Sequence, residues 1–168
     1  IEVLCKVSSC LIADRDPRIQ FVLKGFESDG SPKAEASLLR LSRSEETAAE
    51  DQPGTLSEAI MDQAAWGRLE FVYFHGGKKL SAGVIDAVLN LEKPQRTAKL
   101  LDLLAMEKGK EFESYESSAA ILAISPYLRD PEVAERLQEM EHQGSETWRR
   151  QLASARVTVY LEAVSASV

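Results

Sequence analysis

Histidine is scarce in this sequence, with two among 168 residues, and the common catalytic motifs are missing. His75 and His142 have no cysteine or second histidine at the spacing of metal ligands, which argues against a zinc motif. Neither a G-x-S-x-G turn nor an H-E-x-x-H helix occurs. The sequence therefore predicts no metal, no cofactor and no catalytic residue, and it favours a protein that is not an enzyme.

Cysteine is equally rare, and the two residues, Cys5 and Cys10, are poorly spaced for a disulfide. On a continuous strand their side chains would lie on opposite faces and about 16 Å apart, well beyond disulfide reach. Two reduced thiols favour a reducing compartment such as the cytoplasm. No signal-peptide pattern is present, although the start at Ile1 rather than Met leaves a removed N-terminal segment open.

Positive charge and long apolar runs are also lacking. The formal net charge is −7, and the basic clusters Lys78-Lys79 and Arg149-Arg150 are short, which argues against a nucleic-acid partner. The longest apolar run, from Ala119 to Ile124, is far shorter than the ~20 residues that span a bilayer. The expected partner is another protein, with a basic surface that complements the acidic chain.

Helical signals dominate residues 94–155. Pro94 suits the first turn of a helix, and Asp130 is a good N-cap because it precedes Pro131 and Glu132. Val133, Leu137 and Met140 then follow at i, i+4 and i+7, which is the spacing of one helix face. Ser145 is suited to cap a further helix. The sequence predicts a block of short helices packed on one another, with Leu137 at its centre.

Strand-like segments lie elsewhere. Residues 1–7 and 18–26 alternate apolar and polar side chains, and 69–75 is rich in aromatic and β-branched residues. Ala34 to Leu41 fits a strand or a short helix, and Arg156 to Val164 fits a strand or a continued helix. Together these segments predict an α+β fold, in which a small antiparallel sheet packs on the helical block.

The sequence is long enough for a single domain, 1–168. Residues 44–53 are polar and acidic, which predicts a mobile loop. After it, Thr55 and Glu58 form a capping box at the start of a helix that Gly67 is expected to end.

An all-α repeat is the alternative architecture. Asp16-Pro17 is similar to Asp130-Pro131 and to Lys93-Pro94, and Tyr127-Leu128 recurs as Tyr160-Leu161. Some of these marks recur at intervals in the thirties, and the pattern resembles helical solenoids of the HEAT type. That resemblance rests on short turn motifs and implies stacked helix pairs with no sheet.

One segment has the composition of an anion site. Gly76, Gly77, Lys78 and Lys79 follow the predicted strand, and Ser81 is expected to open the next helix. Glycines let backbone N–H groups approach an anion, while lysines and the positive helix end add charge. The G-x-x-x-x-G-K-[ST] spacing of a nucleotide-binding loop is missing, so an ordinary loop with solvated lysines explains the same residues.

The sequence thus leaves two functions open, and it says nothing of the oligomeric state. The leading hypothesis is a non-catalytic interaction or assembly module, either a subunit of a larger complex or an inhibitor-type binding protein. The alternative is a small anion- or metabolite-binding domain, or an enzyme, that uses the Gly76–Ser81 segment.

Overall fold

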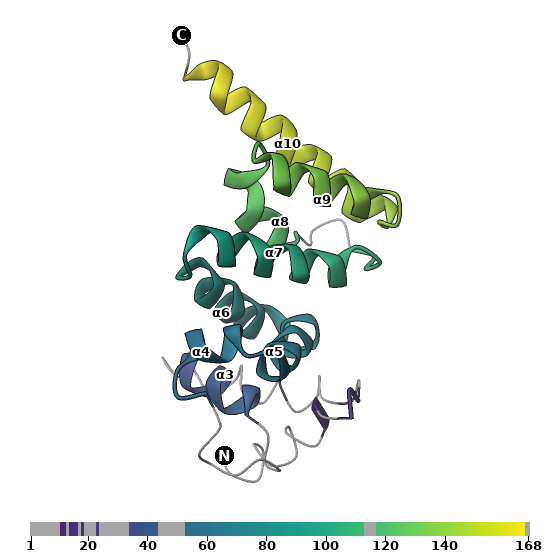
Figure 1. Cartoon of the computed structure of the whole chain (residues 1–168). Coiled ribbons are helices and arrows are strands. Elements are labelled where there is room, and N and C mark those ends of the chain that lie inside the picture. The colour runs from purple at the N-terminus through teal and green to yellow at the C-terminus, as the bar shows by residue number, and fades with distance from the viewer. Residues whose placement is uncertain are drawn as a thin grey trace. The chain divides into compact units, whose positions relative to one another are not determined.

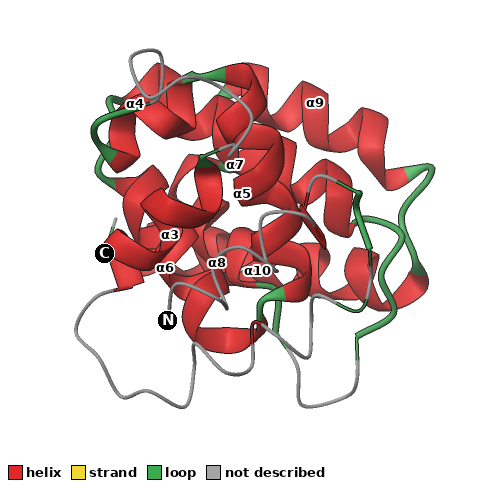
Figure 2. Ribbon diagram, turned by 90° about the horizontal axis from the view of Figure 1, so that it is seen from below, coloured by secondary structure: helices red, strands yellow, loops and turns green. Residues whose placement is uncertain are grey.

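The structure is a computed structural model and describes residues 11–12, 14–16, 18, 23, 34–43, 53–112 and 117–166. Helices account for 78% of this part of the chain, which contains eight α-helices and no strand. In Figure 2 the described elements are drawn as helices joined by loops. The predicted α+β fold with an antiparallel sheet is therefore wrong. The helical content agrees with the all-α alternative, whereas the HEAT-type repeat stays a hypothesis.

The segment predicted as a strand at 69–75 belongs to helix α5 (Gln63–His75). Leu69, Phe71, Val72 and Tyr73 are all buried, so this part of the helix is covered on more than one side. A helix covered on several sides loses the regular alternation of polar and apolar positions, and a short apolar run then resembles a strand. Tertiary packing overrides the β-propensity of these residues.

The strand interpretation also fails in the other segments that the structure describes, and for 34–41 and 156–164 the helical alternative is confirmed. Within 18–26, Arg18 lies in a turn and Leu23 is helical. Ala34 to Leu41 forms helix α3 (Ala34–Ser42), and Arg156 to Val164 continues helix α10 (Glu146–Ser165). The predicted strand at 1–7 lies outside the described residues, as does the predicted mobile loop apart from Pro53.

The chain divides into two compact units, Ile1–Leu91 and Glu92–Val168, and its organisation as a single domain stays a prediction. In the first unit, helices α3, α4 (Leu56–Met61), α5 and α6 (Gly77–Leu89) are all in mutual contact. Their buried side chains form one apolar core. Its members with at most 1% exposure include Leu38, Leu41, Ile60, Leu69, Val72, Val84 and Val88.

Local capping explains where the helices of the first unit begin. The capping box before α4 is confirmed, because Glu58 N–H donates to Thr55 Oγ1 at 3.2 Å and Thr55 N–H donates to Glu58 Oε2 at 3.0 Å. The predicted stop at Gly67 is wrong, since Asp62 ends α4 and caps α5 by accepting from the Ala65 N–H at 2.8 Å. Gly67 lies inside α5.

The second unit contains α7 (Lys93–Glu107), α8 (Ala119–Ile124), the 3-10 helix η2 (Ser125–Tyr127), α9 (Pro131–Glu141) and α10. Helix α7 contacts both α8 and α9, and α10 contacts α8 and η2 (Figure 1). The core of this unit is built from side chains with no measurable exposure. They are Leu100, Leu103, Leu104, Ala120, Ile124, Leu137, Trp148 and Leu152.

The predicted helix starts of the second unit are confirmed. Pro94 lies in the first turn of α7. Asp130 caps α9, with Oδ1 accepting from the Glu132 N–H at 3.3 Å, and Ser145 caps α10, with Oγ accepting from the Trp148 N–H at 3.2 Å. Leu137 is buried as predicted, with Val133 and Met140 beside it on the covered face of α9.

Candidate functional site

The predicted anion segment lies between two helices rather than between a strand and a helix. Gly76 ends α5 and Gly77, with a φ of 77°, begins α6. The Gly76 N–H donates to Val72 O at 2.7 Å, and Ser81 Oγ is within 2.7 Å of both Tyr73 O and Gly77 O. The Ser81 hydroxyl and the Gly76 N–H thus bond to the protein's own backbone.

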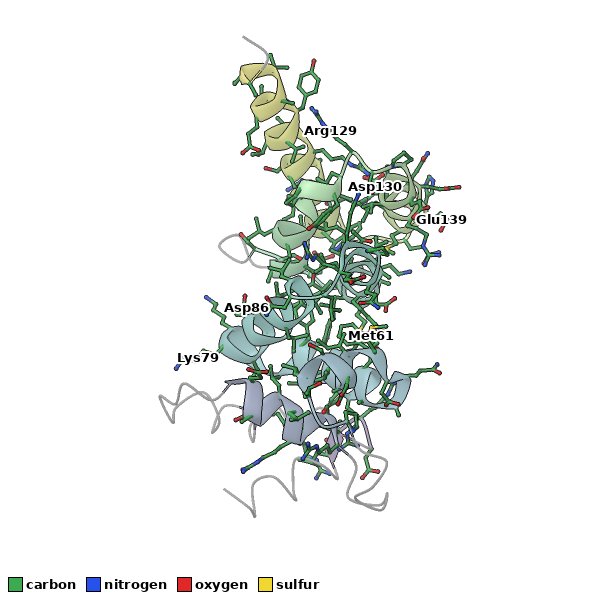
Figure 3. All side chains as sticks on the ribbon, turned by 60° about the vertical axis from the view of Figure 1, so that its left-hand side comes forward. Met61, Lys79, Asp86, Arg129, Asp130 and Glu139 are labelled. Carbon is green, nitrogen blue, oxygen red and sulfur yellow. The ribbon has the colours of Figure 1, made fainter. Side chains whose placement is uncertain are left out.

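The two lysines of this segment, Lys78 and Lys79, are exposed, and Figure 3 shows Lys79 pointing away from the helix. Close packing accounts for Gly76, because a Cβ there would lie 2.4 Å from Val72 O. The anion site therefore stays a prediction. The strand expected before it is a helix, and two of its expected donors, the Gly76 N–H and the Ser81 hydroxyl, bond to backbone carbonyl groups instead. The segment forms a tight corner between α5 and α6.

A more developed surface feature is a groove between α8 and α10, called here the α8–α10 groove. It is half open and encloses about 350 Å³. It is lined by Ser117, Ser118, Ile121, Leu122, Ser125, Gln151, Ser154, Ala155, Thr158, Val159 and Glu162. Ile121, Leu122, Ala155 and Val159 give the groove its apolar lining, and serine and threonine hydroxyl groups make up much of the remainder. Such a surface is suited to hold an apolar side chain of another molecule with polar contacts around it.

Two residues of the groove set its chemical character. Leu122 is 63% exposed, although leucine is among the residues most often buried. Among the described residues that line the groove, Glu162 is the one with an ionisable side chain, and it is exposed. The groove is therefore apolar with one negative charge at its edge.

A buried polar network fixes the wall of the groove. Ser118 caps α8, since Oγ accepts from the Ile121 N–H at 3.0 Å, and the same hydroxyl donates to Glu107 Oε2 of α7. The Ser118 N–H donates to Gln151 Oε1 of α10 at 2.8 Å. Ser118 and Glu107 are only 1% and 5% exposed. Three helices are thus held in register at one point, so the groove is preformed.

A second hollow, of about 300 Å³, lies between α7 and α9. At its edge Lys93 Nζ is 2.9 Å from Asp130 Oδ2. The hydrogen bond from Lys93 lowers the pKa of Asp130, and the same bond raises the pKa of Lys93. The pair links the starts of α7 and α9, and it gives Asp130 a structural role beyond its cap.

Sequence patterns alone missed the network beneath the groove. Ser118 directly before an apolar run was a recognisable N-cap signal. Nothing in the sequence distinguishes Glu107 from an exposed helical glutamate, because its burial depends on α8 and α10. Gln151 likewise looks like an ordinary surface residue.

Within the described ranges, no group of three or more His, Cys, Asp or Glu side chains is placed to hold a metal ion. None of the helices that the structure describes is long and apolar enough to cross a membrane. Comparisons of the chain with protein-family models, with curated proteins and with solved structures find no match. A function can therefore be inferred only from the surface of the molecule itself.

Proposed function

We propose that the protein is a non-catalytic interaction module that binds a segment of another protein in the α8–α10 groove. The observation that carries this proposal is Leu122, a large apolar side chain left 63% exposed beside a preformed apolar groove. Apolar grooves between helices are a common binding site for an amphipathic helix, which inserts side chains spaced at i, i+3 or i+4.

The chemistry of the groove selects the kind of partner. Its apolar lining favours aliphatic or aromatic anchor side chains, because their burial releases water from both surfaces. Glu162 at the rim favours a lysine or arginine next to those anchors. The net charge of −7 acts in the same direction, since it accelerates encounter with a basic partner at low salt. The expected ligand is a basic, amphipathic protein segment.

The test compares two groove variants with a matched control. Glu162→Lys reverses the charge in the groove, and Leu122→Ser removes its exposed apolar wall. Glu139→Lys makes the same charge change on α9, where Glu139 is exposed and points outward in Figure 3. Each tagged protein is used to isolate partners from an extract of the source cells, and the bound proteins are quantified over a range of salt concentrations.

A protein that binds the wild type and Glu139→Lys, and that is lost from both groove variants, supports the proposal. Equal recovery by all four chains would place the binding surface elsewhere. If the wild type retains no protein even at low salt, the interaction function loses its basis.

A further inference from the structure

The second half of α10 is unusually apolar for an exposed helix. Residues 157–165 include one charged side chain, Glu162. Val157, Tyr160, Leu161 and Val164, called here the outer stripe, are 58%, 65%, 57% and 47% exposed. Figure 1 shows this yellow end of α10 extending past α8 and α9. A helix that is apolar on several sides is normally covered on those sides, so the outer stripe needs a partner.

The outer stripe is separate from the α8–α10 groove. At 100° per residue its centre lies roughly 140° around the helix from the groove side, where Ala155, Val159 and Glu162 lie. The first half of α10 buries Trp148 and Leu152 against the unit's own core, on the helix face that continues to Ala155 and Val159 and not on the face of the outer stripe. An occupant of the outer stripe is therefore a second partner, distinct from the ligand of the groove.

The pattern of the outer stripe is self-complementary. Its spacing of i, i+3, i+4 and i+7 is that of the broad apolar face of an amphipathic helix, with two valines flanking a central Tyr160-Leu161 pair. When two copies of this helix lie antiparallel, Val157 of one faces Val164 of the other, and Tyr160 faces Leu161. Such a contact has two-fold symmetry, which is the commonest symmetry of homodimers. We propose that the outer stripe pairs with the outer stripe of a second copy of this chain, in antiparallel orientation.

Charges on α10 favour this orientation. Glu162 lies on the far side of the helix from the stripe, so no charged side chain has to be buried. Upstream on the same face, Glu146 and Arg150 form an ion pair within the chain. In an antiparallel pair centred on residues 160 and 161, Glu146 and Arg150 both lie outside the stretch over which the two helices contact each other. A parallel pair would bring Arg150 against Arg150 of the second copy, which is unfavourable.

The area of the stripe is sufficient for a weak dimer. With half to two-thirds of each side chain exposed, the four residues offer roughly 400 Å² per copy, or about 800 Å² for two. Homodimer interfaces are about 65% apolar, so the whole contact would bury about 1,200 Å². That value is at the lower limit of stable interfaces. The dimer is therefore expected to be a weak one that forms only at high protein concentration.

The experiment measures the mass of the full chain by sedimentation equilibrium over a wide concentration range. We expect the wild type to shift from monomer to dimer as its concentration rises. Tyr160→Lys and Leu161→Glu should each weaken dimerisation about tenfold or more, since each places an unpaired charge in the contact. Leu122→Ser, in the groove, should dimerise like the wild type. Circular dichroism checks that all variants keep the wild-type helix content.

Mixing the two charged variants tests the orientation directly. In an antiparallel pair, the lysine introduced by Tyr160→Lys meets the glutamate introduced by Leu161→Glu in the other chain. The unchanged Leu161 of the first variant then meets the unchanged Tyr160 of the second. The mixture should therefore form a heterodimer at concentrations at which each variant alone is monomeric. No such recovery would overturn the antiparallel pairing.

A wild type that stays monomeric at millimolar concentration would overturn the self-association altogether. That result would leave the proposed function untouched, since recovery of a partner through the groove is measured with other variants. Conversely, dimerisation without any groove-dependent partner would support the outer stripe alone.

Discussion

Helices α9 and α10 carry apolar side chains at the same spacing with opposite exposure. On α9, Val133, Leu137 and Met140 are 2%, 0% and 7% exposed, because α7 covers them. On α10, Val157, Leu161 and Val164 follow the same i, i+4 and i+7 pattern and are 58%, 57% and 47% exposed. An apolar stripe shows that a helix has a face to bury, and it does not show whether the same chain covers that face.

The largest expected difference in the free energy of unfolding lies between substitutions in the first and the second half of α10. Trp148→Ala should lower the free energy of unfolding by about 3–5 kcal/mol, since it empties a fully buried site. Tyr160→Ala should change it by no more than about 0.5 kcal/mol, because Tyr160 is 65% exposed. Urea denaturation at low protein concentration, where dimerisation adds little stability, measures both values.

Trp148→Phe is the control for that comparison. Trp148 Nε1 is buried and makes no hydrogen bond within the described residues, so phenylalanine gives up no polar contact. It should cost less than Trp148→Ala. A Tyr160→Ala variant as unstable as Trp148→Ala would mean that the second half of α10 is covered in the monomer.

The matched leucines sharpen the comparison between the helices. Leu137→Ala should cost about 2–5 kcal/mol through lost burial and a residual cavity. Leu161→Ala should stay within about 0.5 kcal/mol, as should Glu139→Ala on the exposed side of α9. The melting temperatures of the three variants, compared with that of the wild type, measure these differences. If all three melt together with the wild type, α9 does not bury the face that carries Leu137.

A pair of serines makes the same comparison for polar groups. Ser118→Ala removes the α8 cap and the hydroxyl that donates to the buried Glu107 carboxylate, and it should cost about 1–3 kcal/mol. Ser154→Ala, on the exposed rim of the groove, should cost no more than about 0.5 kcal/mol. Equal urea midpoints would show that the network beneath the groove contributes nothing to stability.

The smallest expected effect concerns acid. The hydrogen bond from Lys93 lowers the pKa of Asp130 in the folded state, so this contact stabilises the protein above the ordinary carboxyl pKa. That contribution is lost as the pH falls below about 4 and through the lowered pKa. The pKa of Lys93 is raised in the folded state. The stabilisation that Lys93 gains from Asp130 is therefore fully present below the usual lysine pKa and is lost at high alkaline pH.

The caps of α9 and α10 make this effect measurable. Asp130 titrates and Ser145 does not, so acid should move the NMR amide signal of Glu132 more than that of Trp148. Asp130→Asn should reduce the acid-induced shift of the Glu132 amide signal, because the hydrogen-bond acceptor no longer changes charge. A shift of unchanged size in this variant would mean that Asp130 does not cause it.

How far the sequence predicted this fold differs from one feature to the next. The caps at Thr55, Asp130 and Ser145 were predictable, because each joins atoms within three residues of one another. The strand predicted at 69–75 failed because aromatic and β-branched residues also occur in helices that are covered on several sides. The predicted stop at Gly67 failed because the stronger N-cap at Asp62 had already divided the segment.

The candidate site was less predictable than the fold. The glycines and lysines at 76–79 matched a general anion motif, but Gly76 serves a close approach to Val72 O. Leu122 gave no signal, because it belongs to the longest apolar run, 119–124, in which its neighbours are also apolar. Its exposure depends on where α10 lies, and the spacing within α8 contains no information about that.

By itself, the sequence determined several of the helix starts, the apolar stripes and the acidic charge of this protein. These properties depend on residue chemistry and on neighbours a few positions away. Only the tertiary structure decided which stripes are covered, which places Leu137 inside and Leu161 outside. It also decided the groove wall, where Ser118 meets Glu107 and Gln151 across gaps of 11 and 33 residues. Such contacts depend on how whole helices pack, which no local pattern specifies.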